Sequence, residues 1–279
     1  MKTPNANQAF LPEQIGQLIV LPVTQQSVAM QASTVIQTAE GEHEFRVPLV
    51  SDDPTAAWTA EGEEINASDA VLDEASTGYY KLAGLTVITR ELADDSSPDV
   101  AEQVGAGLAR DVSRKLDAAY FSEAATGANA PAGIGSLDST VVAAGTKFTN
   151  LDPFNAAVFN AETLGAQLTS FVANPADALA LAQLKESTTS ARDLLQPDPT
   201  KPTQRTIAGI PLLTSPTVKA GTVWGIPNSR SLIALRQGTT LDVDRSVFFT
   251  SDKVAIRATF RTGFVFPQPK AIQKIKLGS

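Results

Sequence analysis

The stretch SSPDVAEQVGAGLARDVSRKLDAAYFSEAATG, residues 96–127, decides the fold, because it contains the strongest helical pattern in the chain. Ser97 is a suitable N-cap, Pro98 suits the first helical position, and Gly127 can end the helix. The pattern predicts a helix from 98 to about 125, about 42 Å long at 1.5 Å per residue. Apolar residues at every fourth position would form one stripe along it: Val100, Val104, Leu108, Val112, Leu116 and Tyr120.

Two glycines lie inside this predicted helix, and each costs up to about 1 kcal/mol of helix stability relative to alanine. They form the sequence Gly105-Ala106-Gly107, which is similar to part of a dinucleotide-binding fingerprint. That fingerprint requires a third glycine and a position between a strand and a helix, and neither condition is met. We therefore expect the glycines to serve packing, with a strand crossing the helix closely at this point.

Before the helix, residues 34–90 are predicted to be extended chain. Phe45 and Val47 alternate with charged neighbours, and Leu85 and Val87 alternate less regularly with theirs. Alternation is typical of strands with one buried face, so we expect these two strands to pair as a long hairpin. The polar segment between them is long for a loop in a compact domain, and such loops usually have a function or are disordered.

The charge of this region is unbalanced. From Glu40 to Glu74 the sequence contains eleven acidic residues and one basic residue, Arg46, which leaves a balance of −10. Such a run is most often a solvated face, and it becomes a docking element only where a basic partner exists. The segment from Asp242 to the C-terminus offers such a partner, because it holds seven Lys and Arg residues against three Asp residues.

The second half of the chain predicts a mixed α/β unit. Asp152 before Pro153 and Asn174 before Pro175 each indicate a capped helix start. Phe171–Ala173, between the two helices, has the composition of a short buried strand.

A last long strand is predicted from Lys253 to Arg261, where apolar and polar positions alternate. Successive side chains of a strand point to opposite faces, so Arg257 and Arg261 are expected on the solvent side. The positions expected on the buried side are Val254, Ile256, Ala258 and Phe260.

The composition excludes several kinds of chemistry. The 279 residues include no cysteine, which excludes disulfides, thiolate metal sites and cysteine nucleophiles. The net charge of −8 argues against a protein that grips nucleic-acid phosphates. The single histidine, His43, has no second ligand in a metal-binding motif, and we interpret it as a surface or interface residue. Because phosphate-binding loops and nucleophile elbows are also absent, we predict no enzyme activity and no cofactor.

The sequence shows no signal peptide at its N-terminus. It also has no run approaching the roughly 20 apolar residues of a membrane helix. We therefore expect a soluble protein made in the cytoplasm, with no membrane partner.

Several segments together resemble the major capsid proteins of tailed double-stranded DNA bacteriophages, which have the Hong Kong 97 fold. Their order and spacing over roughly residues 30–275 make the resemblance specific. The segments are AWTAEG at 57–62, KLAGL at 81–85, ITREL at 88–92, Asp95-Ser96-Ser97-Pro98-Asp99, LDAAYF at 116–121, PAGI at 131–134, FVANP at 171–175, IAGIPL at 207–212 and AIRA at 255–258.

The resemblance implies an α+β fold with four parts. They are an N-terminal arm at 1–33, an extended loop (a β-hairpin) with its flanking strands at 34–90, a peripheral domain with a long spine helix at 91–130 and 242–279, and an axial domain at 131–241. It also implies a major capsid protein that self-assembles into the hexamers and pentamers of an icosahedral phage head. That head would be assembled in the host bacterial cytoplasm and would enclose double-stranded DNA in the virion.

The partners that the resemblance implies are further copies of the chain, a separate scaffolding protein, a portal protein, a decoration protein and packaged DNA bound without sequence specificity. In this family the extended loop lies over the peripheral domain of the adjacent subunit. We therefore hypothesise that the acidic loop of one subunit docks on the basic strand and spine helix of the next. The residues expected at this contact are Trp58, Glu61, Glu63, Glu64, Arg110, Arg114, Arg257 and Arg261.

One feature of some family members is missing. They form covalent crosslinks between a lysine of the extended loop and an asparagine of a neighbouring subunit. No lysine occurs here between Lys2 and Lys81, so we predict a shell without such crosslinks.

Three other interpretations remain open from the sequence. An encapsulin, a bacterial cargo compartment, would share the fold, and fold alone does not separate the two functions. A metal-dependent hydrolase using Asp242 and Asp244 would need further ligands from elsewhere in the chain. A monomeric binding module would use Trp58 and Trp224 as ligand contacts.

Overall fold

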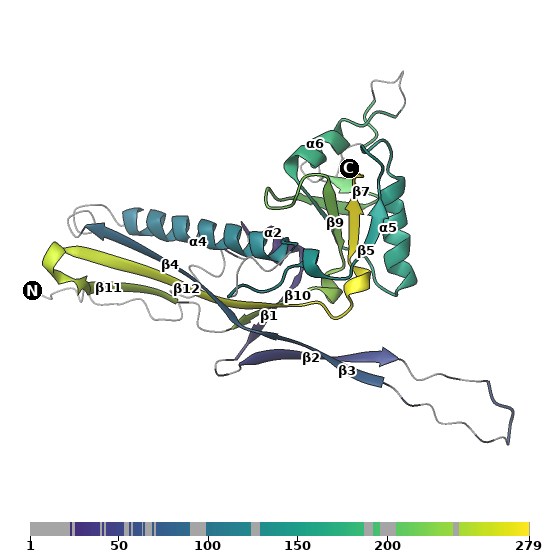
Figure 1. Ribbon diagram of the computed structural model, residues 1–279, viewed down its shortest axis with the longest axis horizontal. Coiled ribbons are helices and arrows are strands. Elements are labelled where there is room, and N and C mark those ends of the chain that lie inside the picture. The colour runs from purple at the N-terminus through teal and green to yellow at the C-terminus, as the bar shows by residue number, and fades with distance from the viewer. Residues whose placement is uncertain are drawn as a thin grey trace, which may run out of the picture.

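The computed structural model describes residues 23, 26–39, 41, 43–52, 56, 58–62, 64, 69, 71–89, 99–123, 129–186, 192–195, 205–236 and 240–278. Several predictions fall outside these residues, including those for residues 1–22 of the arm, Glu63, Ser97 with Pro98, and Gly127. Within the described part, two sheets meet at one end of a long helix, and a two-stranded ribbon projects from the body (Figure 1).

The predicted helix is present as α4, Asp99–Tyr120. Its apolar stripe packs into the core as predicted, since Val112, Leu116 and Tyr120 are 4%, 2% and 0% exposed. The predicted length was wrong. The helix has 22 residues, or about 33 Å at 1.5 Å per residue.

The helix ends at Tyr120 because a returning segment of chain packs against its last carbonyl groups. The amide of Gly135 donates to the carbonyl oxygen of Ser122 over 3.1 Å. A Cβ on Gly133 would lie only 2.3 Å from the carbonyl oxygen of Ala119, so only glycine allows this approach. The helix end is therefore set by a contact with residues more than ten positions later.

The expected role of the helical glycines was also wrong. Among the described residues, no atom outside the local helix backbone lies within 4 Å of the Cβ position at Gly105, and at Gly107 the nearest atom is Nη2 of Arg110, on the same helix, at 3.7 Å. The close approach comes from the strand, because a Cβ on Gly84 would lie 2.5 Å from Cδ2 of Leu108. The strand thus supplies the glycine where helix and sheet meet.

One sheet has five strands, with β12 at its centre. β4 and β11 pair antiparallel with opposite edges of β12, and β10 pairs with the rest of the edge that β11 uses. Parallel β1 extends the sheet beyond β10. The strands are β1 (Thr34–Thr38), β4 (Tyr80–Thr89), β10 (Leu232–Arg236), β11 (Thr240–Phe248) and β12 (Lys253–Val265).

The ribbon is a hairpin of β2 (Glu44–Asp52) and β3 (Val71–Gly78), with Phe45 opposite Thr77. The prediction that the strand around Leu85 pairs with the strand around Phe45 was wrong, because β4 pairs with β12 along its whole length. The chain passes from β3 to β4 across β12 at Gly263, where a Cβ would lie 2.6 Å from the carbonyl oxygen of Gly78.

The other sheet has six strands in the order β5-β13-β9-β6-β8-β7. They are β5 (Thr140–Ala143), β6 (Ser170–Ala173), β7 (Thr206–Ile207), β8 (Ile210–Thr214), β9 (Thr222–Ile226) and β13 (Gln273–Lys276). Helix α6 (Pro175–Ala182) has the predicted cap, because Oδ1 of Asn174 accepts from the amide of Ala176 over 3.0 Å. In helix α5 (Asp152–Thr163), Leu151 occupies the N-cap position without a side-chain hydrogen bond, and Asp152 lies in the first turn instead of at the predicted cap.

One hydrophobic core joins the two sheets. It contains Val172 and Trp224 from the six-stranded sheet together with Ile233 and Phe260 from the five-stranded sheet. The short helix α2 (Val28–Ala32) lies in this core, and a second core under α5 and α6 belongs to the six-stranded sheet alone. Four 3₁₀ turns complete the described chain, at Ile134–Ser136, Asn228–Arg230, Phe249–Ser251 and Pro269–Ala271.

Sheet membership differs from the predicted domain boundaries at two strands. β10 falls within the range predicted for the axial domain, but it belongs to the five-stranded sheet. β13 falls within the range predicted for the peripheral domain, but it belongs to the six-stranded sheet. The chain therefore crosses between the sheets three times, once more than the two crossings that the predicted boundaries imply.

Candidate inter-subunit surfaces

The projecting hairpin has two different faces, because its side chains alternate. Phe45, Val47 and Leu49 lie on one face and are half-buried, whereas Glu44 and Pro48 on the other face are exposed. An isolated two-stranded hairpin is only marginally stable in water. Figure 1 shows this one extending away from both sheets, so its apolar face is available for a partner.

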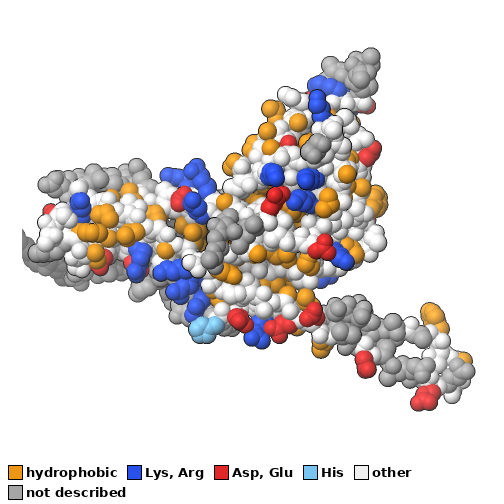
Figure 2. All heavy atoms as spheres, viewed as in Figure 1, with side chains coloured by type: hydrophobic (Ala, Val, Ile, Leu, Met, Phe, Trp, Pro, Cys, Tyr) orange, Lys and Arg blue, Asp and Glu red, His pale blue; other side chains and the backbone are white. Residues whose placement is uncertain are grey.

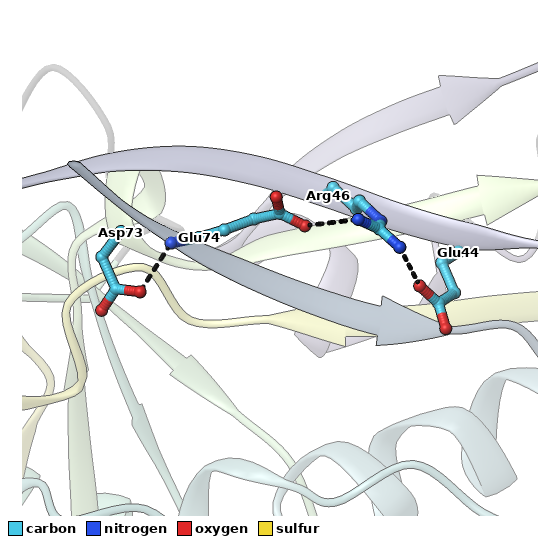
Figure 3. Close-up of polar contacts among 4 residues, drawn as sticks. All are labelled: Glu44, Arg46, Asp73 and Glu74. Atoms are coloured by element: carbon cyan, nitrogen blue, oxygen red, sulfur yellow. Dashed lines mark hydrogen bonds and ion pairs between the residues drawn. The ribbon is translucent and has the colours of Figure 1, made fainter.

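Arg46, the only basic residue in the acidic region, is neutralised within the hairpin (Figure 3). Its Nη2 lies 2.9 Å from Oε2 of Glu44, and its Nη1 lies 3.3 Å from Oε1 of Glu74. The hydrogen bond with Glu44 and the charge of Glu74 raise the pKa of Arg46. Asp73 only accepts the amide of Glu74, over 2.8 Å. The hairpin therefore presents net negative charge to any neighbour.

The predicted contact residues of the loop lie beyond the strands of this hairpin. Trp58 is completely exposed, at 107% of its reference area, and Glu61 and Glu64 are exposed as well. A fully exposed tryptophan is unusual in a folded protein, because tryptophan is highly buried on average. Exposed apolar side chains with polar neighbours are typical of protein-binding surfaces.

The predicted basic residues do not form one surface. Ala258 and Phe260 pack in the same core as Val112 and Leu116 of α4. Arg257 and Arg261 alternate with them and therefore point away from the helix. Arg110 and Arg114 are exposed on α4 itself, which lies on the other side of the sheet. One docked hairpin therefore reaches only one of these two pairs on a given subunit.

The two arginines of β12 differ in availability. Arg257 is paired within its own chain, since its Nη2 lies 2.7 Å and its Nε 3.3 Å from Oδ2 of Asp242. Arg261 lies directly opposite Lys81 in the β12–β4 register. Like charges opposite each other destabilise a sheet. No acid among the described residues forms an ion pair with either of them, so this pair offers an open site for carboxylates.

Two residues that the sequence analysis missed therefore belong to the basic surface. Lys81 is one. Arg236 is the other. Leu235 pairs with Thr262 in the antiparallel β10–β12 register, so the next residue, Arg236, lies beside Arg261. Their charge was visible in the sequence, but their positions depend on cross-strand register, which one sequence does not reveal.

Apolar side chains lie on the same sheet face. Leu85 opposite Arg257 and Val87 opposite Ala255 are 62% and 39% exposed. Figure 2 shows hydrophobic side chains gathered over β4 and β12, with lysine and arginine side chains beside them. We call this surface the β4–β12 face, formed by Lys81, Leu85, Val87, Arg236, Arg257 and Arg261. Its mixed apolar and basic character complements a loop that carries Trp58 and several glutamates.

The candidate catalytic residues do not converge. His43 is exposed next to the hairpin. Asp242 pairs with Arg257, and Asp244 accepts from the hydroxyl and the amide of Ser246, both over 2.7 Å. These hydrogen bonds lower the pKa of Asp244. Among the described residues, no three His, Cys, Asp or Glu side chains are grouped as they would be around a metal ion.

In the part of the chain that the structure describes, no helix has the length and apolar character needed to span a membrane. The long helix α4 is amphipathic instead, with Arg110, Asp111, Arg114 and Lys115 exposed along it.

Two sheets joined at the end of a spine helix, with a projecting acidic hairpin, define a subunit of a protein shell. The chain belongs to the phage capsid family, whose sequence model matches residues 7–277. This confirms the predicted function of a major capsid protein, a structural component of the virion. The members of this family are structural proteins.

Solved capsid structures share the fold. The capsid of the empty GTA particle matches with a TM-score of 0.74 and 21% identity, covering 91% of this chain and 90% of that chain. Mycobacterium phage Adephagia matches with a TM-score of 0.74 and 14% identity, and Microbacterium phage Oxtober96 with 0.71 and 16%, each covering 91% of both chains. These matches confirm the predicted α+β fold of the Hong Kong 97 type. A comparison with curated proteins found no match.

Proposed function

We propose that the chain assembles into hexamers and pentamers of an icosahedral head that encloses double-stranded DNA, and that it has no catalytic activity. The observation that carries this proposal is the β2–β3 hairpin, which leaves the body with an apolar face and a net negative charge (Figure 1). Among the described residues, the strands of this hairpin pair only with each other, and a neighbouring copy supplies a docking surface on its β4–β12 face.

In this proposal the loop of one subunit docks on the β4–β12 face of the next. Trp58 contacts the apolar part near Leu85 and Val87. Glu61, Glu63 and Glu64 approach Arg261 and Lys81. Arg257 contributes less than the sequence suggested, because Asp242 already neutralises it. Arg110 and Arg114 lie on the helix side and are available to a different neighbour.

The remaining parts of the proposal concern organisation and partners. We assign β10 to the peripheral domain and β13 to the axial domain, and we otherwise keep the arm, extended loop, peripheral and axial division. Assembly takes place in the bacterial cytoplasm with a separate scaffolding protein, a portal protein and a decoration protein. DNA is enclosed without sequence-specific contacts, in agreement with a net charge of −8.

Electron microscopy of the purified protein, combined with light scattering for mass, tests this function. Closed icosahedral shells or rings of five and six subunits are the expected result, alone or after addition of the scaffolding protein. A monomer at all protein and salt concentrations, also with the scaffolding protein present, would exclude it. Shells that co-purify with an enzyme cargo in place of DNA would instead indicate a cargo compartment.

The absence of lysine from the extended loop leads to a prediction for assembled heads. When heads are boiled in denaturant and separated on a gel, their shell protein should run as one band near 29.3 kDa. The reason is that a crosslink from this loop needs a lysine amine, and none occurs between Lys2 and Lys81. A ladder of multiples of this mass would contradict the prediction.

A further inference from the structure

The short helix α2 occupies the junction of the two sheets. Val23, Ala29, Met30 and Ala32 are 0–3% exposed and belong to the core that joins both sheets. A five-residue helix has no stability of its own. Its position therefore depends on contacts with the rest of the subunit.

The N-terminus of α2 is held by a carboxylate of the spine helix. Asp117 Oδ1 accepts from the hydroxyl of Ser27 over 2.6 Å and from the amide of Ala29 over 3.0 Å, and its Oδ2 accepts from the amide of Val28 over 3.1 Å. Asp117 is 6% exposed. A negative charge at a helix N-terminus satisfies amides that have no partner within the helix.

The C-terminus of α2 is held by the same turn of the spine helix. Ser33, the C-cap residue, donates to the hydroxyl of Tyr120 over 2.9 Å. The hydroxyl of Ser231 lies 2.6 Å from that of Tyr120 and 2.8 Å from that of Ser33. The three hydroxyls form a closed buried ring. Asp117 and Tyr120 are three residues apart and therefore lie on one face of α4.

We propose that Asp117 and Tyr120 form a clamp that grips α2 by both ends and fixes it at the junction of the two sheets. The clamp makes α2 a separate unit that opens without unfolding of the sheets, because α2 is short and both of its ends are held from one helical turn. This inference does not depend on the docking of the hairpin.

The test is amide hydrogen exchange on the assembly-free protein with Asp117→Ala. Exchange at Val28, Ala29 and Gln31 should become roughly ten- to hundredfold faster, the loss expected for hydrogen bonds to a charged group. The amide of Gln31 reports on α2 because it donates to the carbonyl oxygen of Ser27 over 3.2 Å. Amides of β9, around Trp224, should keep their wild-type rates.

Two further variants make the test specific. Asp111→Ala removes an exposed acid from the same helix and should leave all these rates unchanged. Tyr120→Phe keeps the packed ring, removes only the hydroxyl, and should speed exchange at Thr34 while the β9 amides remain slow. Equal acceleration in α2 and β9 would overturn the proposal, because α2 would then open only with the whole subunit. Unchanged exchange at Val28 and Ala29 in Asp117→Ala would also overturn it.

The pH dependence of the clamp follows from the environment of Asp117. Burial raises its pKa, although the hydrogen bonds from Ser27, Ala29 and Val28 pull it down. Of the elements around Asp117, α2, β1 and β6 carry no charged side chain. On α4 itself, the neighbouring titratable or charged groups are the phenol of Tyr120 and the exposed Arg114. When Asp117 takes up a proton, the hydroxyl of Ser27 can reverse and accept from it, so acid does not open the clamp.

A folded-state pKa above the unfolded value means that the contribution of Asp117 is largest at low pH and declines as the pH rises through the folded-state pKa. The unfolding free energy of the wild type relative to that of Asp117→Asn should therefore increase as the pH falls toward the pKa of an ordinary aspartate. Urea unfolding at several pH values measures this difference. A difference that shrinks in acid would show that the clamp requires the charged form.

Discussion

Replacement of Gly133 by alanine should destabilise the folded subunit by about 3 kcal/mol, because it inserts a methyl group where backbone atoms leave no room. The added Cβ would lie 2.3 Å from the carbonyl oxygen of Ala119, 2.4 Å from that of Tyr120 and 2.9 Å from that of Ser122. These oxygens belong to the end of the spine helix and cannot rotate away as a side chain can. Urea unfolding followed by circular dichroism measures the effect.

The matched control is Gly105→Ala in the same helix. No described residue places an atom within 4 Å of the Cβ position of Gly105 outside the local helix backbone, and alanine is favoured over glycine in a helix by up to about 1 kcal/mol. This variant should therefore be more stable than the wild type. A Gly133→Ala subunit as stable as the wild type would mean that the returning segment does not pack on the helix end.

The spine helix illustrates what the sequence could and could not reveal. Its existence and buried stripe were predictable, because a repeat of about 3.6 residues is a local signal. Its end was not, because the chain leaves the helix seven residues before Gly127, where Gly133 and Gly135 approach the last carbonyl groups. That contact joins positions that no local pattern connects.

The prediction of which two strands form the hairpin was wrong for a different reason. β3 has the sequence VLDEASTG, whose polar residues show little alternation, so the better-patterned strand around Leu85 was chosen as the partner of Phe45. The acidic character of the loop was nevertheless predictable from the charge balance. For the basic surface, the sequence pointed to Arg257 and Arg261, but it did not reveal their neighbours. Sheet register decides that Lys81 lies opposite Arg261 and that Asp242 neutralises Arg257.

The second large effect is expected for Arg261→Glu, which should prevent shell assembly at concentrations where the wild type assembles. An exposed ion pair contributes at most about 1 kcal/mol. Charge reversal replaces attraction by repulsion, which gives about 2 kcal/mol per docked loop and a roughly 30-fold higher concentration for the onset of assembly. Light scattering against protein concentration measures the onset. The variant monomer should unfold at the same urea concentration as the wild-type monomer or at a slightly higher one, since the repulsion between Arg261 and Lys81 is removed.

Two comparisons separate the β4–β12 face from the helix side. Arg110→Glu reverses a charge on the exposed part of α4 and should shift the onset much less, because the docked loop does not reach that side of the sheet. High salt should raise the onset for the wild type, since screening weakens exposed ion pairs. If Arg110→Glu were as damaging as Arg261→Glu, the loop would dock on the helix and the proposed face would be wrong.

Charge exchange gives the most direct test of the contact. Glu61→Lys with Glu64→Lys should impair assembly alone, and the same change combined with Arg261→Glu and Lys81→Glu should restore a large part of it. Recovery of this kind requires the loop residues and the β4–β12 face residues to contact each other. Each set of substitutions alone adds only repulsion, and two independent defects would be additive. The partners must lie on different subunits, since the hairpin projects away from the sheet that carries Arg261 (Figure 1). A combined variant that assembles worse than either parent would place the loop on some other surface of the neighbouring subunit.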